Sequence, residues 1–242
     1  RLGTFNLHAA LLPQYRGAAP INWAVINGEK ATGVTTFMID EGMDTGGIMF
    51  REQCLIGDEE NAGDVHDKLM EMGSKMVVQT VEAIIEKHVD TRVQKSFIQG
   101  SEVLKPAPKI TKELCHIDFR CKTRHVYNLI RGLSPYPGAY TELVKDDKIQ
   151  QLKIYSAERI EGERFTAMLS EAGVSSASAG DIISDGRTFF AIATSDGAVS
   201  VKELQISGKR KMAVKDFLLG FRDIQNCKTT EGTSSKITGH HA

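Results

Sequence analysis

The sequence lacks an excess of charge of either sign. It holds 30 lysine and arginine residues against 31 aspartate and glutamate residues, which gives a formal net charge of −1 at pH 7 with histidine neutral. This balance excludes a uniformly basic surface, so any contact with nucleic acid has to come from a local patch. Apolar runs of membrane-spanning length are also missing, and we expect no association with a membrane.

Cysteine is scarce and shows no functional spacing. No C-x-x-C pair and no secretory signal is visible, so we expect a reduced, cytoplasmic protein. The sequence also lacks a glycine-rich phosphate-binding loop, an internal repeat and any cluster with metal-ligand spacing, and we therefore expect no metal. The four cysteines are Cys54, Cys115, Cys121 and Cys227.

What the sequence does hold is a set of polar side chains beside breaks in regular structure, near the start of the chain. Residues 4–7 are mostly apolar and residues 32–40 are rich in β-branched and aromatic side chains, so both ranges predict strands. Asn6 and His8 lie two residues apart and would share one face of the first strand. Asp44 follows the second strand in a glycine-rich loop. Neighbouring strands would bring all three side chains to one end of a sheet, where open α/β sheets bind ligands.

This combination of side chains suits acyl transfer. A carboxylate beside an imidazole fixes the tautomer of the imidazole and raises its basicity, and an amide can donate to a developing oxyanion without titrating. No residue in the run is an obvious nucleophile, so attack by a substrate amine on a bound acyl group fits better than a covalent intermediate. A lone histidine near a strand end, or a lone Asp-Thr-Gly, is usually structural, and only the joint pattern favours a catalytic site.

One long motif carries a family resemblance. Residues 6–20 read Asn-Leu-His-Ala-Ala-Leu-Leu-Pro-Gln-Tyr-Arg-Gly-Ala-Ala-Pro, and Thr-Gly-Val-Thr and Asp-Glu-Gly-Met-Asp-Thr-Gly follow. Together these motifs resemble the folate-dependent formyltransferases. The Arg-Gly-Ala-Ala-Pro run is similar to the members that act on methionyl-tRNA, whereas the purine-pathway members have a different loop there. One departure is Ala10, because the family usually has a serine there whose hydroxyl could cap the loop.

The resemblance implies a reaction and a site. Asn6, His8 and Asp44 would surround the formyl group of 10-formyltetrahydrofolate, and the methionine amine of initiator methionyl-tRNA would attack that group. Asn6 and His8 would stabilise the oxyanion, while Asp44 would hold His8 and, through water, help to move the amine proton. The resemblance also implies contacts to the folate derivative from Leu11, Leu12, Pro13, Asp40, Glu41, Gly42 and Met43, and contacts to the tRNA from Arg16, Lys209, Arg210 and Lys211.

The remaining elements follow from periodicity and turn residues. Apolar positions recur three and four residues apart along residues 61–88, which predicts a long helix. Short strands with Asp-Gly and Asp-Asp turns predict a small barrel of the OB type in the C-terminal half. Residues 158–179 are polar and small, and we expect a mobile loop. The other expected helices are 20–27, 122–133 and 214–221, and the other expected strands are 47–55, 139–144, 148–157, 180–184, 188–194 and 199–206.

These elements predict an α/β protein of two domains. We expect part of a doubly wound, Rossmann-like formyltransferase domain in residues 1–89, a linker in 90–112, an OB-like tRNA-binding domain in 113–225 and a disordered tail in 226–242. We expect a monomer.

The chain opens without methionine, just before the expected catalytic strand. The resemblance implies upstream residues that carry the first βαβ units and part of the folate pocket. We therefore expect the sequence to be a fragment that expresses poorly, is inactive by itself, and yields a protease-resistant piece beginning between residues 90 and 112.

Two other functions remain open. A related enzyme that formylates an amino sugar nucleotide would share the Asn, His and Asp set, and some relatives of that kind carry a similar Arg-Gly-x-Ala-Pro loop. A non-catalytic RNA-binding protein would depend on residues 209–211 and not on His8. By itself this basic run fits a solvated turn, but the family has a similar Gly-Lys-Lys segment in its tRNA-contacting domain, which favours a phosphate contact.

Overall fold

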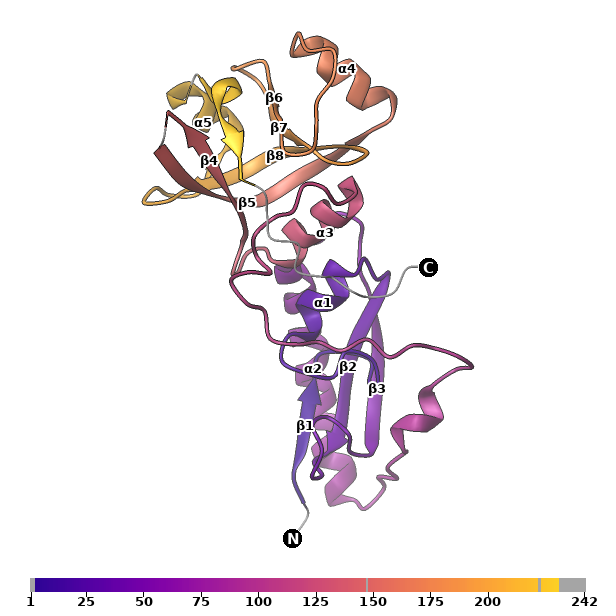
Figure 1. Ribbon diagram of the computed structural model, residues 1–242. Coiled ribbons are helices and arrows are strands. Elements are labelled where there is room, and N and C mark those ends of the chain that lie inside the picture. Colours follow the sequence, from indigo (N-terminus) through magenta and orange to yellow (C-terminus); the bar gives the residue numbers. More distant parts are fainter. Residues whose placement is uncertain (1–2, 147, 222, 231–242) are drawn as a thin grey trace. The chain divides into compact units, whose positions relative to one another are not determined.

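The computed structural model describes residues 3–146, 148–221 and 223–230 (Figure 1). The chain forms two compact units, which follow one another in sequence with the division between Ile110 and Thr111. The predicted α/β class is confirmed, with one small sheet in the first unit and a larger, nearly closed sheet in the second. Within the described ranges, no helix combines the length and the apolar character needed to cross a bilayer.

The first unit is built on an antiparallel sheet with the strand order β1-β2-β3. Thr35 lies opposite His8 on one side and opposite Arg51 on the other. The predicted strands and helices of this part are confirmed, with ends that differ by a few residues. The elements are β1 (Phe5–His8), α1 (Pro20–Ile26), β2 (Ala31–Met38), β3 (Ile48–Leu55), α2 (Ala62–Ile85) and the 3-10 helix η1 (Gln94–Phe97).

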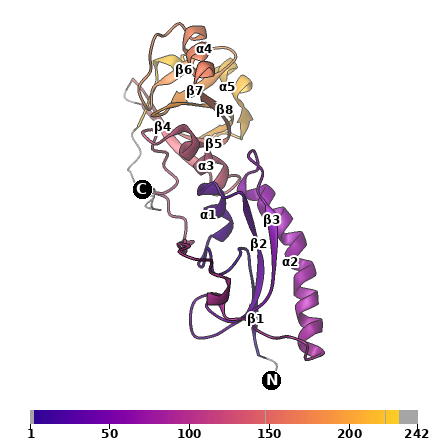
Figure 2. The same ribbon diagram turned by 90° about the vertical axis from the view of Figure 1, so that its right-hand side faces the viewer.

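Strand β2 is buried on both faces, because different segments cover its two sides. Val34 packs in a core cluster with residues of α2, and the Thr36 hydroxyl lies 3.0 Å from that of Thr80. Figure 2 shows α2 along this face of the sheet. On the opposite face, Phe37 packs with Leu12, Ile48 and Phe97. The second face carries the predicted functional residues, so α2 supports the site from behind.

Much of the segment predicted as a linker packs against the first unit. Arg92 forms an antiparallel bridge with Ile48, and Ala107 forms a parallel bridge with Gly17. The backbone between these bridges contains η1. Its Phe97 packs against Phe37, on the face of the sheet opposite α2. Backbone pairing at Arg92 and Ala107 and the partial burial of Phe97 therefore hold residues 92–107 against the first unit.

The second unit is a single antiparallel sheet with helices packed around it. Its strand order is β10-β4-β5-β8-β7-β6, and β9 pairs with β8. The long β5–β8 pair shifts register near Ser156, where bulges allow a strand to bend. The elements are α3 (Thr123–Gly132), β4 (Ala139–Lys145), β5 (Lys148–Glu161), α4 (Glu163–Glu171), β6 (Ile182–Ser184), β7 (Phe190–Ala193), β8 (Gly197–Ile206), β9 (Met212–Ala213), α5 (Val214–Gly220), the 3-10 helix η2 (Ile224–Asn226) and β10 (Lys228–Thr229).

The mobile loop predicted at residues 158–179 is wrong for residues 158–171, which form the end of a strand and a helix. Strand β5 continues to Glu161 because it pairs with β8, and α4 follows. The helix forms because Phe165, Met168 and Leu169 pack on a cluster that includes Ile160. Their spacing of three and four residues is a helical signal hidden among polar residues.

The tail predicted at residues 226–242 begins inside the fold. Lys228 and Thr229 form β10, which pairs with Val144 and Leu143 of β4. Disorder is therefore wrong for the start of this range, where backbone pairing supplies the order. Residues 231–242 of the predicted tail lie outside the described residues.

Candidate active site

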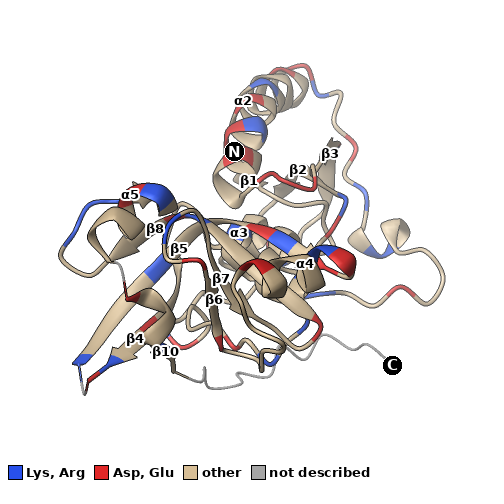
Figure 3. Ribbon diagram, turned by 90° about the horizontal axis from the view of Figure 1, so that it is seen from above, with Lys and Arg blue, Asp and Glu red and all other residues tan. Residues whose placement is uncertain are grey.

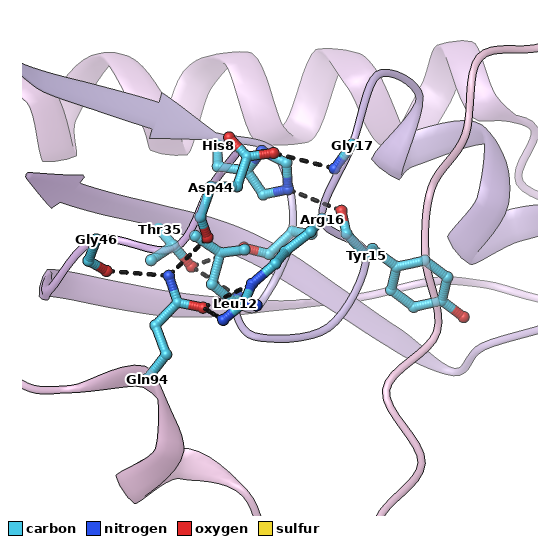
Figure 4. Close-up of polar contacts among 10 residues, drawn as sticks. His8, Leu12, Tyr15, Arg16, Gly17, Thr35, Asp44, Gly46 and Gln94 are labelled. Atoms are coloured by element: carbon cyan, nitrogen blue, oxygen red, sulfur yellow. Dashed lines mark hydrogen bonds and ion pairs between the residues drawn. The ribbon is translucent and has the colours of Figure 1, made fainter. Parts of the chain in front are cut away.

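The imidazole of His8 is held in one orientation at the end of β1. The side chain is buried, with 5% of the residue exposed. Its Nε2 lies 2.9 Å from the carbonyl oxygen of Tyr15, and a carbonyl can only accept, so Nε2 carries the hydrogen. The other nitrogen, Nδ1, therefore points to the opposite side, toward Asp44 (Figure 4). The ring packs edge-on against Phe37, with 6.5 Å between centroids.

Asp44 faces His8 from the loop between β2 and β3. Its Oδ2 lies 3.8 Å from His8 Nδ1 and accepts a hydrogen bond of 3.0 Å from the backbone N–H of Gly17. Because β1 and β2 are antiparallel, the two residues do not lie at matching strand ends, and the loop folds back along the sheet to bring them together. The 3.8 Å separation is an ion-pair distance and exceeds that of a direct hydrogen bond.

Tyr15 is fixed both through its backbone and through its side chain. It has φ of +59°, a left-handed conformation that is unusual for a residue with a large side chain. Its hydroxyl donates to Glu29 over 2.5 Å and accepts from Asn27, while Lys105 also binds Glu29. Burial, and then the hydrogen bond to Glu29, raise the pKa of Tyr15 above its ordinary value. The phenol therefore stays protonated and anchors the residue whose carbonyl orients His8.

The turn after His8 is closed by a threonine of β2. The buried hydroxyl of Thr35 donates to the carbonyl of Ala10 over 2.7 Å and lies 3.2 Å from the N–H of Leu12, from which it accepts. Ala10 itself is fully buried in the core. The hydroxyl that Ala10 lacks is thus supplied from the neighbouring strand, and the turn remains closed.

Arg16 and Gln94 join a second loop to this centre. The guanidinium of Arg16 donates through Nε and Nη2 to the side-chain oxygen of Gln94, over 3.0 and 2.5 Å. The Gln94 amide nitrogen donates to the carbonyls of Asp44 and Gly46 (Figure 4). Arg16, predicted to contact tRNA, therefore lies partly buried beside the predicted catalytic loop.

The residues predicted to contact the folate derivative fall into two groups. Leu12 and Pro13 are buried, and Leu12 packs in the core, so only their backbones could reach a ligand. Leu11 is half-buried. The loop at residues 40–43 is exposed, and the Asp40 carboxylate shapes it by accepting from Gly42 N–H and from a threonine hydroxyl. This loop is available to a ligand.

Asn6 occupies the expected place on β1. It lies two residues before His8, so the two side chains leave the strand on one face. The residue is exposed, and within the described part of the chain its side chain makes no hydrogen bond. Its amide is therefore available to a substrate. No group of three or more metal-ligating side chains occurs among the described residues.

The predicted basic run lies in the second unit, in the turn after β8. In Figure 3 this turn, next to α5, is blue. Lys209 and Arg210 are exposed, whereas Lys211 binds Glu203 over 2.8 Å and lies over the ring of Tyr155. Lys209 and Arg210 therefore present more available charge than Lys211.

Comparisons with known proteins decide the family. The family model described as formyl transferase matches residues 1–81, and the model described as formyl transferase, C-terminal domain, matches residues 109–222. A methionyl-tRNA formyltransferase of Phocaeicola vulgatus is 48% identical over 229 residues, which cover 94% of this chain and 67% of that protein. The chain belongs to the formyltransferase family.

A second named formyltransferase agrees with this assignment, and a solved structure shares the fold. The methionyl-tRNA formyltransferase of Parabacteroides distasonis is 45% identical over 225 residues, which cover 93% of this chain and 66% of the relative. The chain thus spans about two thirds of the length of these relatives. HypX from Aquifex aeolicus in complex with tetrahydrofolic acid has a TM-score of 0.63 at 20% identity, covering 90% of this chain and 35% of HypX. At that identity the likeness shows the fold alone.

The formyltransferase motif pointed to His8 and Asp44, which lie together, but it missed the residues that hold them. Tyr15 and Gly17 are part of the motif, but they act through the backbone, which residue type does not reveal. The Tyr15 carbonyl accepts from His8, and the Gly17 N–H donates to Asp44. A glycine with φ of +129° could have been suspected from the break in regular structure. Nothing in the sequence indicated Gln94. In a polar segment, the sequence cannot distinguish a glutamine that is buried from one that is exposed.

Gly17 offers a test of this backbone geometry. A Cβ there would lie 2.4 Å from the Ala107 carbonyl oxygen, at a φ that side chains rarely adopt. Overpacking costs about 1–3 kcal/mol and strained backbone about 1–3 kcal/mol, so Gly17→Ala is expected to lower the free energy of unfolding by about 2 kcal/mol or more. Gly100→Ala is the matched control, because it shares a positive φ but has open space around it. Denaturant titrations that found equal losses for both variants would contradict the described contact.

Proposed function

We propose that the chain carries the catalytic centre of a methionyl-tRNA formyltransferase. The reaction would move the formyl group of 10-formyltetrahydrofolate to the methionine amino group of initiator methionyl-tRNA, in the cytoplasm. The observation that carries the proposal is the pairing of His8 with Asp44 at 3.8 Å, beside Asn6, in a chain 48% identical to an enzyme of that name. The exposed loop at residues 40–43, with Met43 76% exposed, fits an apolar ring of the folate derivative.

The chain's own residues would supply charge stabilisation and proton transfer. The methionine amine forms a C–N bond to the formyl carbon, and the formyl oxygen takes up negative charge. Asn6 would donate a hydrogen bond to that oxygen. The Tyr15 carbonyl takes the hydrogen on Nε2 of His8, so His8 would donate from Nδ1 only as the imidazolium, with both ring nitrogens protonated beside the Asp44 carboxylate. Asp44 would accept the amine proton through water and return a proton as the C–N bond to the folate nitrogen breaks.

The acceptor is supported by sequence identity. The relatives with 45–48% identity are named methionyl-tRNA formyltransferases. The sugar 3N-formyl transferase WlaRD has a TM-score of 0.59 at 21% identity, covering 85% of this chain and 66% of that protein. That likeness extends to the fold alone, so an amino sugar nucleotide is the less favoured acceptor. A non-catalytic RNA-binding role does not explain why His8 and Asp44 are paired.

A direct assay separates the acceptors. Full-length protein, with 10-formyltetrahydrofolate as donor, is expected to formylate initiator methionyl-tRNA and not an amino sugar nucleotide. Formylated methionine would be measured after hydrolysis of the tRNA ester. Transfer to the sugar nucleotide alone would replace the proposed acceptor, and transfer to neither acceptor would contradict the proposed function.

The three predicted catalytic residues have separate tests. Asn6→Ala, His8→Ala and Asp44→Ala are each expected to lower kcat by about 100-fold or more, as the loss of one oxyanion donor does elsewhere. Asn6→Ala is the cleanest of the three, because its exposed side chain makes no hydrogen bond in the described chain. His66→Ala is the matched control, because His66 is an exposed histidine on the outer side of α2. Near-normal turnover of His8→Ala would favour a binding role instead.

The basic turn has a test in the salt dependence of tRNA binding. The double variant Lys209→Ala, Arg210→Ala is expected to weaken binding and flatten the plot of log affinity against log salt, by about 0.9 per phosphate contact in duplexes. Lys211→Ala should do less, because Glu203 already pairs with that lysine. Removal of two exposed lysines of the first unit, Lys30 and Lys75, controls for net charge. An unchanged slope in the double variant would make this run a solvated turn.

A further inference from the structure

Gln94 is a buried amide that uses all of its hydrogen-bonding groups. Only 4% of the residue is exposed, at the first position of η1. The amide nitrogen donates to Asp44 O over 2.7 Å and to Gly46 O over 3.0 Å. The side-chain oxygen accepts twice from the Arg16 guanidinium, over 3.0 and 2.5 Å. Two donors and two acceptor positions are the full capacity of a glutamine, so each partner has a distinct role.

The two donated bonds fix the backbone on which the Asp44 carboxylate depends. Asp44 has φ of +54°, in the left-handed region. Backbone of this kind persists only where surrounding contacts hold it. Gln94 binds the carbonyl of Asp44 itself and the carbonyl two residues later, so it spans the peptide units that follow the carboxylate-bearing residue. Nothing else in the described chain donates to these two carbonyls from a side chain.

The two accepted bonds fix the loop on the other side of the site. Arg16 precedes Gly17, whose N–H donates to the Asp44 carboxylate. The same glutamine thus holds the loop that carries Asp44 and the loop that carries the donor to Asp44 (Figure 4). Both loops meet at His8, which Tyr15 orients.

We infer that Gln94 is the positioning residue for the catalytic carboxylate, holding Asp44 at its distance from His8 through backbone hydrogen bonds. The inference rests on the proposed function. Gln94 contacts neither His8 nor the predicted formyl position, so it acts through Asp44 and Arg16. A glutamic acid of equal size cannot replace it, because a carboxylate accepts from Arg16 but cannot donate to two carbonyls.

Two substitutions separate the roles of this amide in the full-length protein. Gln94→Glu keeps an acceptor for Arg16 but removes both donors to the Asp44 loop. We expect it to lower kcat by about 10-fold to 100-fold, because a ~1 Å misplacement near a reacting group costs about 100-fold, with an unchanged KM for tRNA. Gln94→Ala also releases Arg16, and we expect it to lower kcat similarly and to raise that KM. Gln79→Glu, an exposed change of the same kind on α2, is the control.

Amide hydrogen exchange gives a readout that does not depend on turnover. Exchange at the Gly17 N–H is expected to become faster in both Gln94 variants, because the accepting Asp44 carboxylate is no longer fixed, and to be unchanged in the Gln79 control. Wild-type kcat in Gln94→Glu would overturn the inference, as would unchanged Gly17 exchange in both variants. So would a loss of activity that matches only the loss of folded protein. An inactive wild-type protein would contradict the proposed function, and exchange would then still decide whether Gln94 holds the loop.

Discussion

The carbonyl oxygen of Tyr15 is the point on which the site depends. It accepts from His8 Nε2, and this one contact decides which ring nitrogen faces Asp44. Tyr15 presents this carbonyl from a left-handed backbone conformation, which costs about 1–3 kcal/mol and persists only where neighbouring contacts hold it. The neighbours are Lys105, whose carbonyl accepts the Tyr15 N–H, and Glu29, which accepts its hydroxyl. A relaxed Tyr15 would leave a buried imidazole nitrogen unpaired, at a cost of about 1–3 kcal/mol.

The register of β2 couples this site to the core behind it. Alternate residues of the strand face opposite sides, so Thr35 closes the turn after His8 while Thr36 lies against Thr80 of α2. Each hydroxyl is needed on its own face, and both faces are buried. A slip of one residue would exchange the two faces and leave polar groups unpaired on each. The packing of α2 therefore specifies the position of the turn as well as the stability of the sheet.

The sequence allowed prediction where the signal was local. The spacing of Asn6 and His8, the strands around them and the long helix all follow from short-range pattern, and the motif supplied Asp44. The antiparallel return that brings Asp44 to His8 depends on tertiary pairing, which periodicity does not report. Gln94 was missed for a related reason, because its role consists of contacts to residues about 50 and 80 positions away. Likewise α4 was hidden because its apolar face is narrow and its remaining positions are polar.

The segment with Pro106 and Pro108 shows how a linker-like composition can build a rigid support. Proline fixes φ and removes an N–H, and the residue before a proline is driven to an extended conformation. Of residues 106–108, only Ala107 has a backbone N–H. That N–H donates to the carbonyl of Arg16, and the Ala107 carbonyl accepts from the N–H of Ala19. The carbonyl of Pro108 accepts from Trp23 Nε1 over 2.7 Å. A segment whose prolines suggest a flexible connection therefore pairs with the loop that contains Tyr15, whose carbonyl orients the predicted catalytic histidine.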